Sequence, residues 1–207
     1  MDIKILLSNI AETTEAFDVS GLSLNTKTLT KGDLFIALQG EKSHGAEYID
    51  SAIENGCIAV LIEGRDVDCG VPTIRIDNLK PHLSGLAQNF YTKAKDVDLI
   101  AVTGTNGKTS VSHYISQLLD FLEVNNGVIG TLGISKVEKK SINTTPDIFS
   151  IYSSLEEYSS QGIKLAIIEA SSNALMQDRL EGLSFVQGIF TNLTQDHLDY
   201  HQTMGNY

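Results

Sequence analysis

Residues 104–110 (GTNGKTS) place two glycines, a lysine and a threonine between an apolar run and a helix-like run. The glycines let the backbone turn its N–H groups inward, and the start of the following helix adds positive potential. Lys108 can then reach the terminal phosphates of a nucleotide, and the hydroxyl of Thr109 can bind Mg²⁺. The standard phosphate loop has another glycine where this sequence has Val102, so Gly104 makes the turn in a shorter variant. The segment predicts a nucleotide-binding loop; the alternative is an ordinary glycine-rich turn.

A single carboxylate, Glu169, lies near the end of the apolar run 165–170 (LAIIEA). Burying a carboxylate in a strand is costly unless it is paired or binds a cation. Because the carboxyl end of this predicted strand lies near the expected phosphate site, we expect Glu169 to bind Mg²⁺. A solvated or salt-bridged glutamate is the alternative.

Two histidines four residues apart, His197 and His201, follow the last apolar run. Such spacing on a helix is typical of zinc sites, but the glutamate of the HExxH motif is absent because Leu198 stands there. We therefore do not expect zinc. His197 could bind a hard cation or a phosphate, whereas His201 is either a surface residue or one that orients its neighbours.

Two further polar segments, 141–147 (SINTTPD) and 171–179 (SSNALMQDR), lie beside the predicted strand ends. The first offers hydroxyls, an amide and a helix-starting Pro-Asp pair, which suit a polar ligand. In the second, Gln177 and Arg179 follow closely after the candidate metal ligand, and the planar fork of Arg179 matches a carboxylate or phosphate. The alternatives are helix capping for the first segment and surface exposure for the second.

The elements that must position these residues form two α/β units. In the first, residues 1–93, we expect strands at 33–38, 58–63 and 73–76 and helices at 3–12, 45–56 and 79–92. A polar linker is expected over 92–96.

The second unit, residues 94–207, alternates strands and helices on a larger scale. Strands are predicted at 97–103, 127–131, 165–170 and 186–191, and helices at 108–122, 148–161 and 173–181. This alternation indicates parallel βαβ units with right-handed crossovers. Ligands of such sheets bind outside the carboxyl ends of the strands, which is where the residues above lie.

Composition excludes several classes of protein. The 207 residues carry 15 basic and 26 acidic side chains, a formal net charge of −11, without a basic block that would suit nucleic acid. No apolar run reaches the length needed to cross a membrane, and the start lacks the long apolar stretch of a signal peptide. Two cysteines, Cys57 and Cys69, indicate reduced thiols. We therefore expect a soluble cytoplasmic protein, and without a GxSxG elbow covalent serine hydrolysis is disfavoured.

These motifs in this order resemble the Mur ligases, ATP-dependent amide-forming enzymes of bacterial cell-wall synthesis. The resemblance is carried by 102–109 (VTGTNGKT) together with 191–201 (TNLTQDHLDYH), and it extends to 22–27 and 31–38 near the amino terminus. Residues 143–145 (NTT) and 169–172 (EASS) narrow it to the members that add the third residue of the peptide. The resemblance implies a small α/β UDP-binding domain followed by an incomplete parallel-sheet P-loop ATPase domain.

The implied reaction extends UDP-N-acetylmuramoyl-L-alanyl-D-glutamate by a diamino acid, meso-diaminopimelate being favoured over L-lysine. ATP phosphorylates the glutamate side chain, and the amine attacks the resulting acyl phosphate. The implied ATP-binding residues are Gly104, Thr105, Asn106, Gly107, Lys108, Thr109 and Ser110. The implied magnesium ligands are Thr109, Glu169 and His197, and Lys108, Glu169 and His197 would be catalytic. The implied substrate contacts are Leu24 and Thr26 for the UDP end and Asn143, Thr144, Thr145, Ser171, Gln177 and Arg179 for the muramoyl-dipeptide.

The chain ends at Tyr207. The resemblance implies a carbamylated lysine, adenine contacts and a third domain beyond that point. We therefore expect a truncated chain that is inactive alone, and a non-catalytic nucleotide-binding module is the alternative from another class. A monomer with no nucleic-acid or membrane partner is expected.

Overall fold

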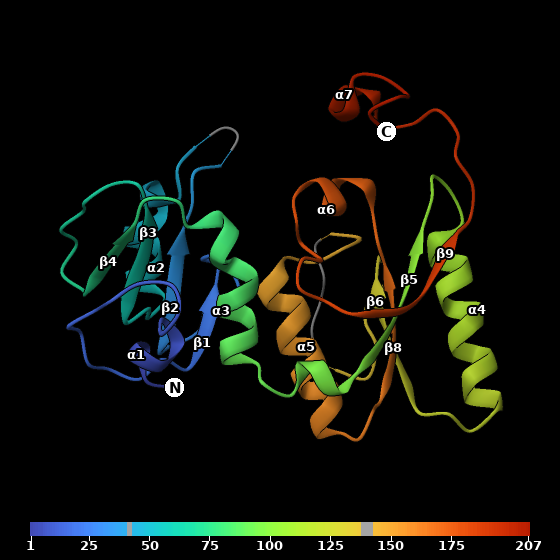
Figure 1. Cartoon of the computed structure of the whole chain (residues 1–207), viewed down its shortest axis with the longest axis horizontal. Coiled ribbons are helices and arrows are strands. Elements are labelled where there is room, and N and C mark those ends of the chain that lie inside the picture. The colour runs from blue at the N-terminus through green and yellow to red at the C-terminus, as the bar shows by residue number, and fades with distance from the viewer. Residues whose placement is uncertain (41–42, 138–142) are drawn as a thin grey trace. The chain divides into compact units, whose positions relative to one another are not determined.

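The computed structural model describes residues 1–40, 43–137 and 143–207 (Figure 1). The chain divides into two compact units, Met1–Phe90 and Tyr91–Tyr207. Residues 141–142 of the first predicted polar segment lie outside the described residues. Within the described part of the chain, no helix is long and apolar enough to cross a membrane. The expected α/β class with parallel sheets is confirmed.

The first unit is built on a four-stranded parallel sheet in the order β1-β2-β3-β4. Its strands are β1 (Gly21–Ser23), β2 (Asp33–Ala37), β3 (Ala59–Glu63) and β4 (Thr73–Ile76). Strands β2, β3 and β4 were predicted from their apolar runs. Strand β1 was not predicted, because three residues are too few to show an alternating pattern.

The helices of the first unit are short. They are α1 (Ile3–Leu6), the 3₁₀ turn η1 (Gly45–Tyr48), α2 (Ile49–Glu54), the 3₁₀ turn η2 (Lys80–His82) and α3 (Leu83–Phe90). The helix predicted over 3–12 was wrong beyond Leu6, where the chain enters a turn through Ser8 and Asn9, residue types that compete with helical hydrogen bonds. Helix α2 ends at Asn55 as expected, and Gly56 follows in the left-handed region at φ +94°.

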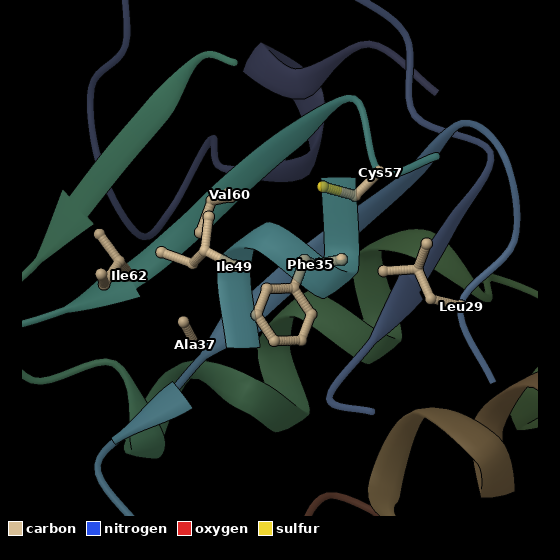
Figure 2. Packing of buried hydrophobic residues seen from close by; sticks show 8 residues of the cluster. Leu29, Phe35, Ala37, Ile49, Cys57, Val60 and Ile62 are labelled. Atoms are coloured by element: carbon tan, nitrogen blue, oxygen red, sulfur yellow. The ribbon is translucent and has the colours of Figure 1, made fainter. Parts of the chain in front are cut away.

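A buried apolar cluster fills the space between the sheet of the first unit and α2 (Figure 2). Its members are Leu29, Phe35, Ala37, Ile49, Ala52, Cys57, Val60 and Ile62. Strand residues alternate between faces, so Leu34 and Ile36 point away from this cluster, yet both are also buried. The strands are thus covered on both sides, as parallel strands usually are.

The second unit contains a five-stranded sheet in the order β7-β6-β8-β5-β9. Its strands are β5 (Asp98–Thr103), β6 (Asn126–Gly130), β7 (Gly133–Ile134), β8 (Leu165–Glu169) and β9 (Phe185–Phe190). All pairings are parallel except that of the unpredicted β7 with β6. Since β8 pairs with β5, in a register that opposes Glu169 to Val102, the polar segments that follow these two strands lie at one edge of the sheet.

Helices α4 (Lys108–Phe121) and α5 (Ile148–Ser160) cover opposite faces of this sheet (Figure 1). Val128 of β6 belongs to the cluster that packs against α4. The next residue back, Gly127, faces the other way and lies so close to the ring of Tyr158 on α5 that a Cβ would overlap it. Each helix therefore continues the strand–helix alternation expected from the sequence.

Three short elements complete the second unit: the 3₁₀ turn η3 (Ala94–Asp96), α6 (Ser172–Met176) and α7 (Leu198–His201). The predicted linker at 92–96 is part of the packed structure, since Ala94 is buried and the Lys93 amide donates to Glu156 at 2.7 Å. Helix α6 ends five residues earlier than predicted, because the chain reverses at Asp178, whose φ is +59°.

Candidate active site

The segment after β5 forms a tight loop that leads directly into α4. Gly104 and Gly107 both have positive φ, +126° and +87°, which favours glycine at these two positions. A Cβ on Gly104 would also overlap the Thr191 hydroxyl and crowd the backbone of Asn192. Gly104 therefore makes the turn, as predicted from the missing glycine at position 102.

The side chain of Lys108 folds over this loop. Its Nζ donates to the carbonyl oxygens of Gly104 at 2.7 Å and Thr105 at 3.1 Å. Lys108 is also the first residue of the 14-residue helix α4, whose N-terminal end carries a partial positive charge. Gly107, at the N-cap position, has no side chain to satisfy the first N–H groups of α4. An ammonium group and helix-terminal donors thus meet at one point, which is the chemistry that binds an anion.

The carboxylate of Glu169 is fully buried at the carboxyl end of β8. Its Oε2 accepts hydrogen bonds from the hydroxyls of Thr109 at 2.8 Å and Thr131 at 2.9 Å, and its Oε1 accepts from the Thr131 amide at 3.1 Å. No Lys or Arg in the described ranges forms an ion pair with it. The carboxylate lies against Gly130, where a Cβ would overlap it. The Glu169 carboxylate, at the carboxyl end of the central strand β8, is therefore buried and accepts hydrogen bonds from neutral donors.

This oxygen-rich cluster fits a hard cation. The hydroxyls of Thr109 and Thr131 lie 3.3 Å apart and both contact the same carboxylate oxygen. Mg²⁺ prefers such oxygen ligands and usually keeps several waters or phosphate oxygens, with one or two carboxylates. Among the described residues no three His, Cys, Asp or Glu side chains gather, so a cation would depend on Glu169 and the hydroxyls.

Thr131 is a candidate site residue that sequence reasoning missed. It was included as the last residue of a predicted strand at 127–131, whereas β6 ends at Gly130 and Thr131 begins the following turn. The rule that ligands bind just beyond strand ends could have identified it.

His197 lies on the loop that precedes α7. Its amide donates to the Asp196 carboxylate at 2.8 Å, and its ring packs edge-on against Tyr207 at 6.3 Å between centroids. Tyr207 in turn donates to the Thr105 hydroxyl at 3.1 Å. None of the contacts found in the described segments joins His197 to Thr109 or Glu169, so its role as a magnesium ligand stays a prediction.

His201 orients its neighbours and is not a surface residue, which decides between the two alternatives. It is only 5 % exposed, and its Nε2 lies 2.9 Å from the hydroxyl of Ser172 at the start of α6. The ring of Tyr200 meets it edge-on and the ring of Tyr207 is tilted against it, each with its centroid 5.0 Å away. The contact with Ser172 connects α7 to α6.

The predicted substrate residues around α6 form one hydrogen-bonded network next to Glu169. The hydroxyl of Thr145, which is fully buried, donates to the Glu169 carbonyl at 2.6 Å and accepts from the Ser171 amide at 3.1 Å. Arg179 donates through Nη1 to the Thr145 carbonyl at 2.7 Å and through Nε to Gln177 at 3.0 Å. Arg179 is therefore partly buried and held in place, unlike the exposed alternative.

The remaining predicted contacts lie on either side of this network. Thr144 shares a hydrogen bond of 3.2 Å with Thr131, and Asn143 is exposed beside it. Helix capping also holds here, since Asp147 accepts from the Ser150 amide at the start of α5. Ser110 is exposed in the first turn of α4.

Leu24 and Thr26 lie in the first unit, immediately after β1. Both are half-buried in a turn in which the Ser23 hydroxyl donates to the Asn25 carbonyl at 2.9 Å. Their position after a parallel strand matches the expected location of a ligand, and their contact with UDP stays a prediction.

Comparison with known families agrees with this architecture. Residues 102–207 match the Mur ligase middle domain, and residues 18–91 match the Mur ligase family catalytic domain. The chain belongs to the Mur ligase family, as the sequence motifs indicated.

Its relatives include named ligases. The chain is 38 % identical over 212 residues to UDP-N-acetylmuramoyl-L-alanyl-D-glutamate--2,6-diaminopimelate ligase of Haemophilus influenzae strain PittGG, covering 97 % of this chain and 43 % of the relative. The protein of that name from Alkaliphilus oremlandii is 35 % identical, with coverages of 92 % and 40 %. The chain thus spans less than half the length of these relatives.

Solved structures give the same picture. A structure of the 2,6-diaminopimelate ligase matches all of this chain and 43 % of its own, with a TM-score of 0.79 and 28 % identity. A MurF ligase from Thermotoga maritima in complex with ADP matches with a TM-score of 0.60 at 21 % identity, over 90 % of this chain and 40 % of its own. The second likeness concerns the fold alone.

Proposed function

We propose that this chain carries the nucleotide-binding part of an ATP-dependent amide-bond ligase. The ligase would add meso-diaminopimelate to UDP-N-acetylmuramoyl-L-alanyl-D-glutamate in peptidoglycan synthesis. The observation that carries the proposal is the buried Glu169 carboxylate in contact with Thr109, next to the Lys108 loop at the ends of two paired strands. The names of the Haemophilus and Alkaliphilus relatives support the diamino acid, and L-lysine is the alternative.

The described residues suit phosphoryl transfer, which depends mainly on positioning and on electrostatic stabilisation. Bound ATP supplies the phosphoryl group that activates the substrate carboxylate for attack by an amine, and Mg²⁺ neutralises phosphate charge. Lys108 and the N–H groups of residues 104–110 would hold the polyphosphate. Thr109 and Glu169, with Thr131, would hold the cation, and His197 is the further ligand proposed.

The network around Thr145 suits the acceptor end of the substrate. Asn143, Thr144 and Ser171 are at least partly exposed and offer hydrogen bonds to a peptide, and the positive charge of Arg179, which Gln177 and Thr145 hold in place, favours an anionic ligand beside them. We assign to the muramoyl-dipeptide Asn143, Thr144, Thr145, Ser171, Gln177 and Arg179, and to the UDP end Leu24 and Thr26. We further propose that the protein acts as a monomer in the cytoplasm, where ATP is available.

The proposal is tested first by isothermal titration of ATP into the 207-residue chain with and without Mg²⁺. We expect Mg²⁺-dependent binding, and we expect Lys108→Ala to weaken it about tenfold or more because charge-assisted contacts to phosphate are lost. Lys164→Ala is the matched control, since Lys164 is an exposed lysine at the far end of β8.

Unchanged ATP affinity in Lys108→Ala would refute the assigned role of the loop. Amide formation is measured separately, with a longer relative that contains the whole ligase, the muramoyl-dipeptide and diaminopimelate. The 207-residue chain alone is expected to bind ATP or a UDP-sugar without ligation, and amide formation by that chain would exclude a non-catalytic nucleotide-binding module.

A further inference from the structure

The segment after β9 contacts the phosphate loop through its side chains as well as its backbone. The carboxamide of Asn192 pairs with the backbone of Asn106 at both ends. Its Nδ2 donates to the Asn106 carbonyl at 2.9 Å, and its Oδ1 accepts from the Asn106 amide at 3.1 Å. Both backbone groups of one loop residue are thus bound by a single side chain.

Thr191 adds a second donor to the same place. Its hydroxyl lies 2.7 Å from the Asn106 carbonyl and 3.1 Å from the Thr103 carbonyl, so it bridges the end of β5 and the middle of the loop. The Asn106 carbonyl therefore accepts from Thr191 and Asn192 together, which occupies both of its lone pairs. The peptide plane between Asn106 and Gly107 thus accepts two hydrogen bonds, and the plane between Thr105 and Asn106 donates a third, so neither plane rotates freely.

Thr105 is also bound by the segment after β9, through the backbone of that segment. Its amide donates to the Asn192 carbonyl at 2.9 Å. Its hydroxyl donates to the Thr194 carbonyl at 3.1 Å and accepts from the Thr194 amide at 2.9 Å. Residues 191–194 thus bind the two non-glycine residues that lie between Gly104 and Gly107.

This arrangement compensates for a weakness in the loop itself. Gly104 and Gly107 have positive φ angles, and glycine loses more conformational freedom on ordering than any other residue. A loop with two such residues binds an anion weakly if binding itself must order the backbone. Contacts made on folding, before any ligand arrives, remove that cost from binding.

We infer that Thr191 and Asn192 are positioning residues, which fix the peptide planes on either side of Asn106 so that the N–H groups of residues 107–109 are preorganised for a polyphosphate. The inference rests on the proposed function, since it assumes that the loop binds ATP. It assigns to the segment after β9 the ordering of the loop backbone, a role distinct from phosphate binding by the loop and from cation binding by the Glu169 cluster. The residues act through the loop backbone and need no contact with the nucleotide.

The test uses matched variants of the 207-residue chain. Asn192→Ala removes the paired contacts with Asn106, and Thr191→Val removes the hydroxyl while keeping the shape of the side chain. Thr191→Ser keeps the hydroxyl and is the rescue variant. Gln187→Ala, an exposed position on β9 outside the loop contacts, is the control.

Two quantities are measured, amide hydrogen exchange of residues 104–109 without ligand and the dissociation constant of ATP with Mg²⁺. Each lost hydrogen bond corresponds to a few-fold change, so we expect Asn192→Ala to speed loop exchange and to weaken ATP binding by about tenfold. Thr191→Val should change both in the same direction, and Thr191→Ser and Gln187→Ala should match the parent. A purely structural tie would lower the thermal stability of Thr191→Val and leave its loop exchange and ATP affinity as in the parent.

The outcomes are distinguishable. If the parent chain binds no ATP, the proposed function fails and this inference fails with it. If the parent binds ATP and Lys108→Ala weakens binding, while Asn192→Ala and Thr191→Val bind ATP as the parent does, only the inference is overturned. If Asn192→Ala does not fold, the comparison of Thr191→Val with Thr191→Ser decides the question alone.

Discussion

Short polar side chains at strand ends make up the candidate magnesium site. Glu169 is fully buried, and its described partners are Thr109 and Thr131, which leaves its negative charge without a protein counter-charge in the described structure. Such a carboxylate favours a cation because pairing offsets the cost of desolvation. The neutral hydroxyls orient the carboxylate and keep its charge available.

The close approach of Gly130 to Glu169 gives a prediction at this scale. Gly130→Ala should lower the free energy of unfolding by about 1–3 kcal/mol, because the new methyl group overlaps the carboxylate and forces it to move. The displaced carboxylate should also weaken Mg²⁺-dependent ATP binding. Urea unfolding and calorimetric titration measure the two effects.

Gly188→Ala is the matched control for Gly130→Ala. Gly188 is also a strand glycine, and a Cβ added there would meet nothing within 4 Å, so stability should not fall and should rise by about 0.5 kcal/mol, with ATP binding unchanged. Equal behaviour of the two variants would show that the carboxylate adjusts without cost.

The positions of single site residues were predictable where a known motif assigns a role to a particular side chain. Lys108, Thr109 and Glu169 were expected at the ends of two strands, and the structure brings Thr109 and Glu169 into direct contact. Thr131 was missed because it was taken as the last residue of a strand, whereas β6 ends at Gly130 and the turn to β7 begins at Thr131. His197 follows a long loop whose path depends on contacts with distant residues, and its position relative to Glu169 could not be predicted from spacing.

Elements of the second unit interlock through one buried tyrosine. Tyr158 of α5 lies against Gly127 of β6, and its hydroxyl donates to the carbonyls of Ser135 at 2.7 Å and Val128 at 3.2 Å. Burial raises the pKa of Tyr158 from 10.0 to about 12, and the carbonyl contacts need the protonated hydroxyl. The packing of α5 against the β6–β7 hairpin thus depends on the protonated hydroxyl of Tyr158.

This linkage predicts a specific pH dependence. Because the pKa is raised in the folded state, the contribution of Tyr158 to stability is complete below pH 10 and is lost as pH rises through about 12. The slope of that loss is about 1.4 kcal/mol per pH unit, since one proton is released on unfolding. Urea unfolding of Tyr158→Phe should show this alkaline loss reduced, together with a stability lower by about 1 kcal/mol at neutral pH.

Tyr114→Phe serves as the control, because Tyr114 is 63 % exposed on α4 and should leave the alkaline profile as it is in the parent. An alkaline profile of Tyr158→Phe identical to that of the parent would contradict the assigned linkage.

Long elements were predictable and short ones were not, for a physical reason. Strands β5 and β8 contain continuous apolar runs, and β8 is buried on both faces, as is usual for a central parallel strand. Strands β1 and β7 are two or three residues long and exist because a neighbouring strand supplies hydrogen bonds. Helix α1 ends early because Ser8 and Asn9 compete with helical hydrogen bonds, and four residues are too few to show a helical pattern.

On the scale of the whole molecule, charge and architecture constrain how a nucleotide is bound. The chain has a net charge of −11, so its overall field repels a polyphosphate. Binding must therefore depend on local donors, namely Lys108 and the N-terminal end of α4. The two units present separate strand ends, the first after β1 and the second after β5 and β8.

If the second unit binds ATP and the first unit binds the UDP end of the substrate, each ligand should protect a different segment from hydrogen exchange. ATP with Mg²⁺ should slow amide exchange in residues 104–110, and UDP should slow it in residues 24–26, because ligands stabilise the segments that they contact. Mass spectrometry of proteolytic peptides resolves the two regions. Protection of residues 104–110 by UDP alone, with none near Leu24, would contradict the assignment of the UDP end.

The metal cluster is assembled from three chain segments far apart in sequence, at or just beyond the carboxyl ends of β5, β6 and β8. No peptide cut from this chain could reproduce it, and neither α4 nor the loop alone contains the carboxylate. During refolding, the ability to bind magnesium nucleotide would therefore appear only after β8 has inserted between β5 and β6. The binding of a fluorescent nucleotide during refolding would then report when β8 has paired with β5 and β6.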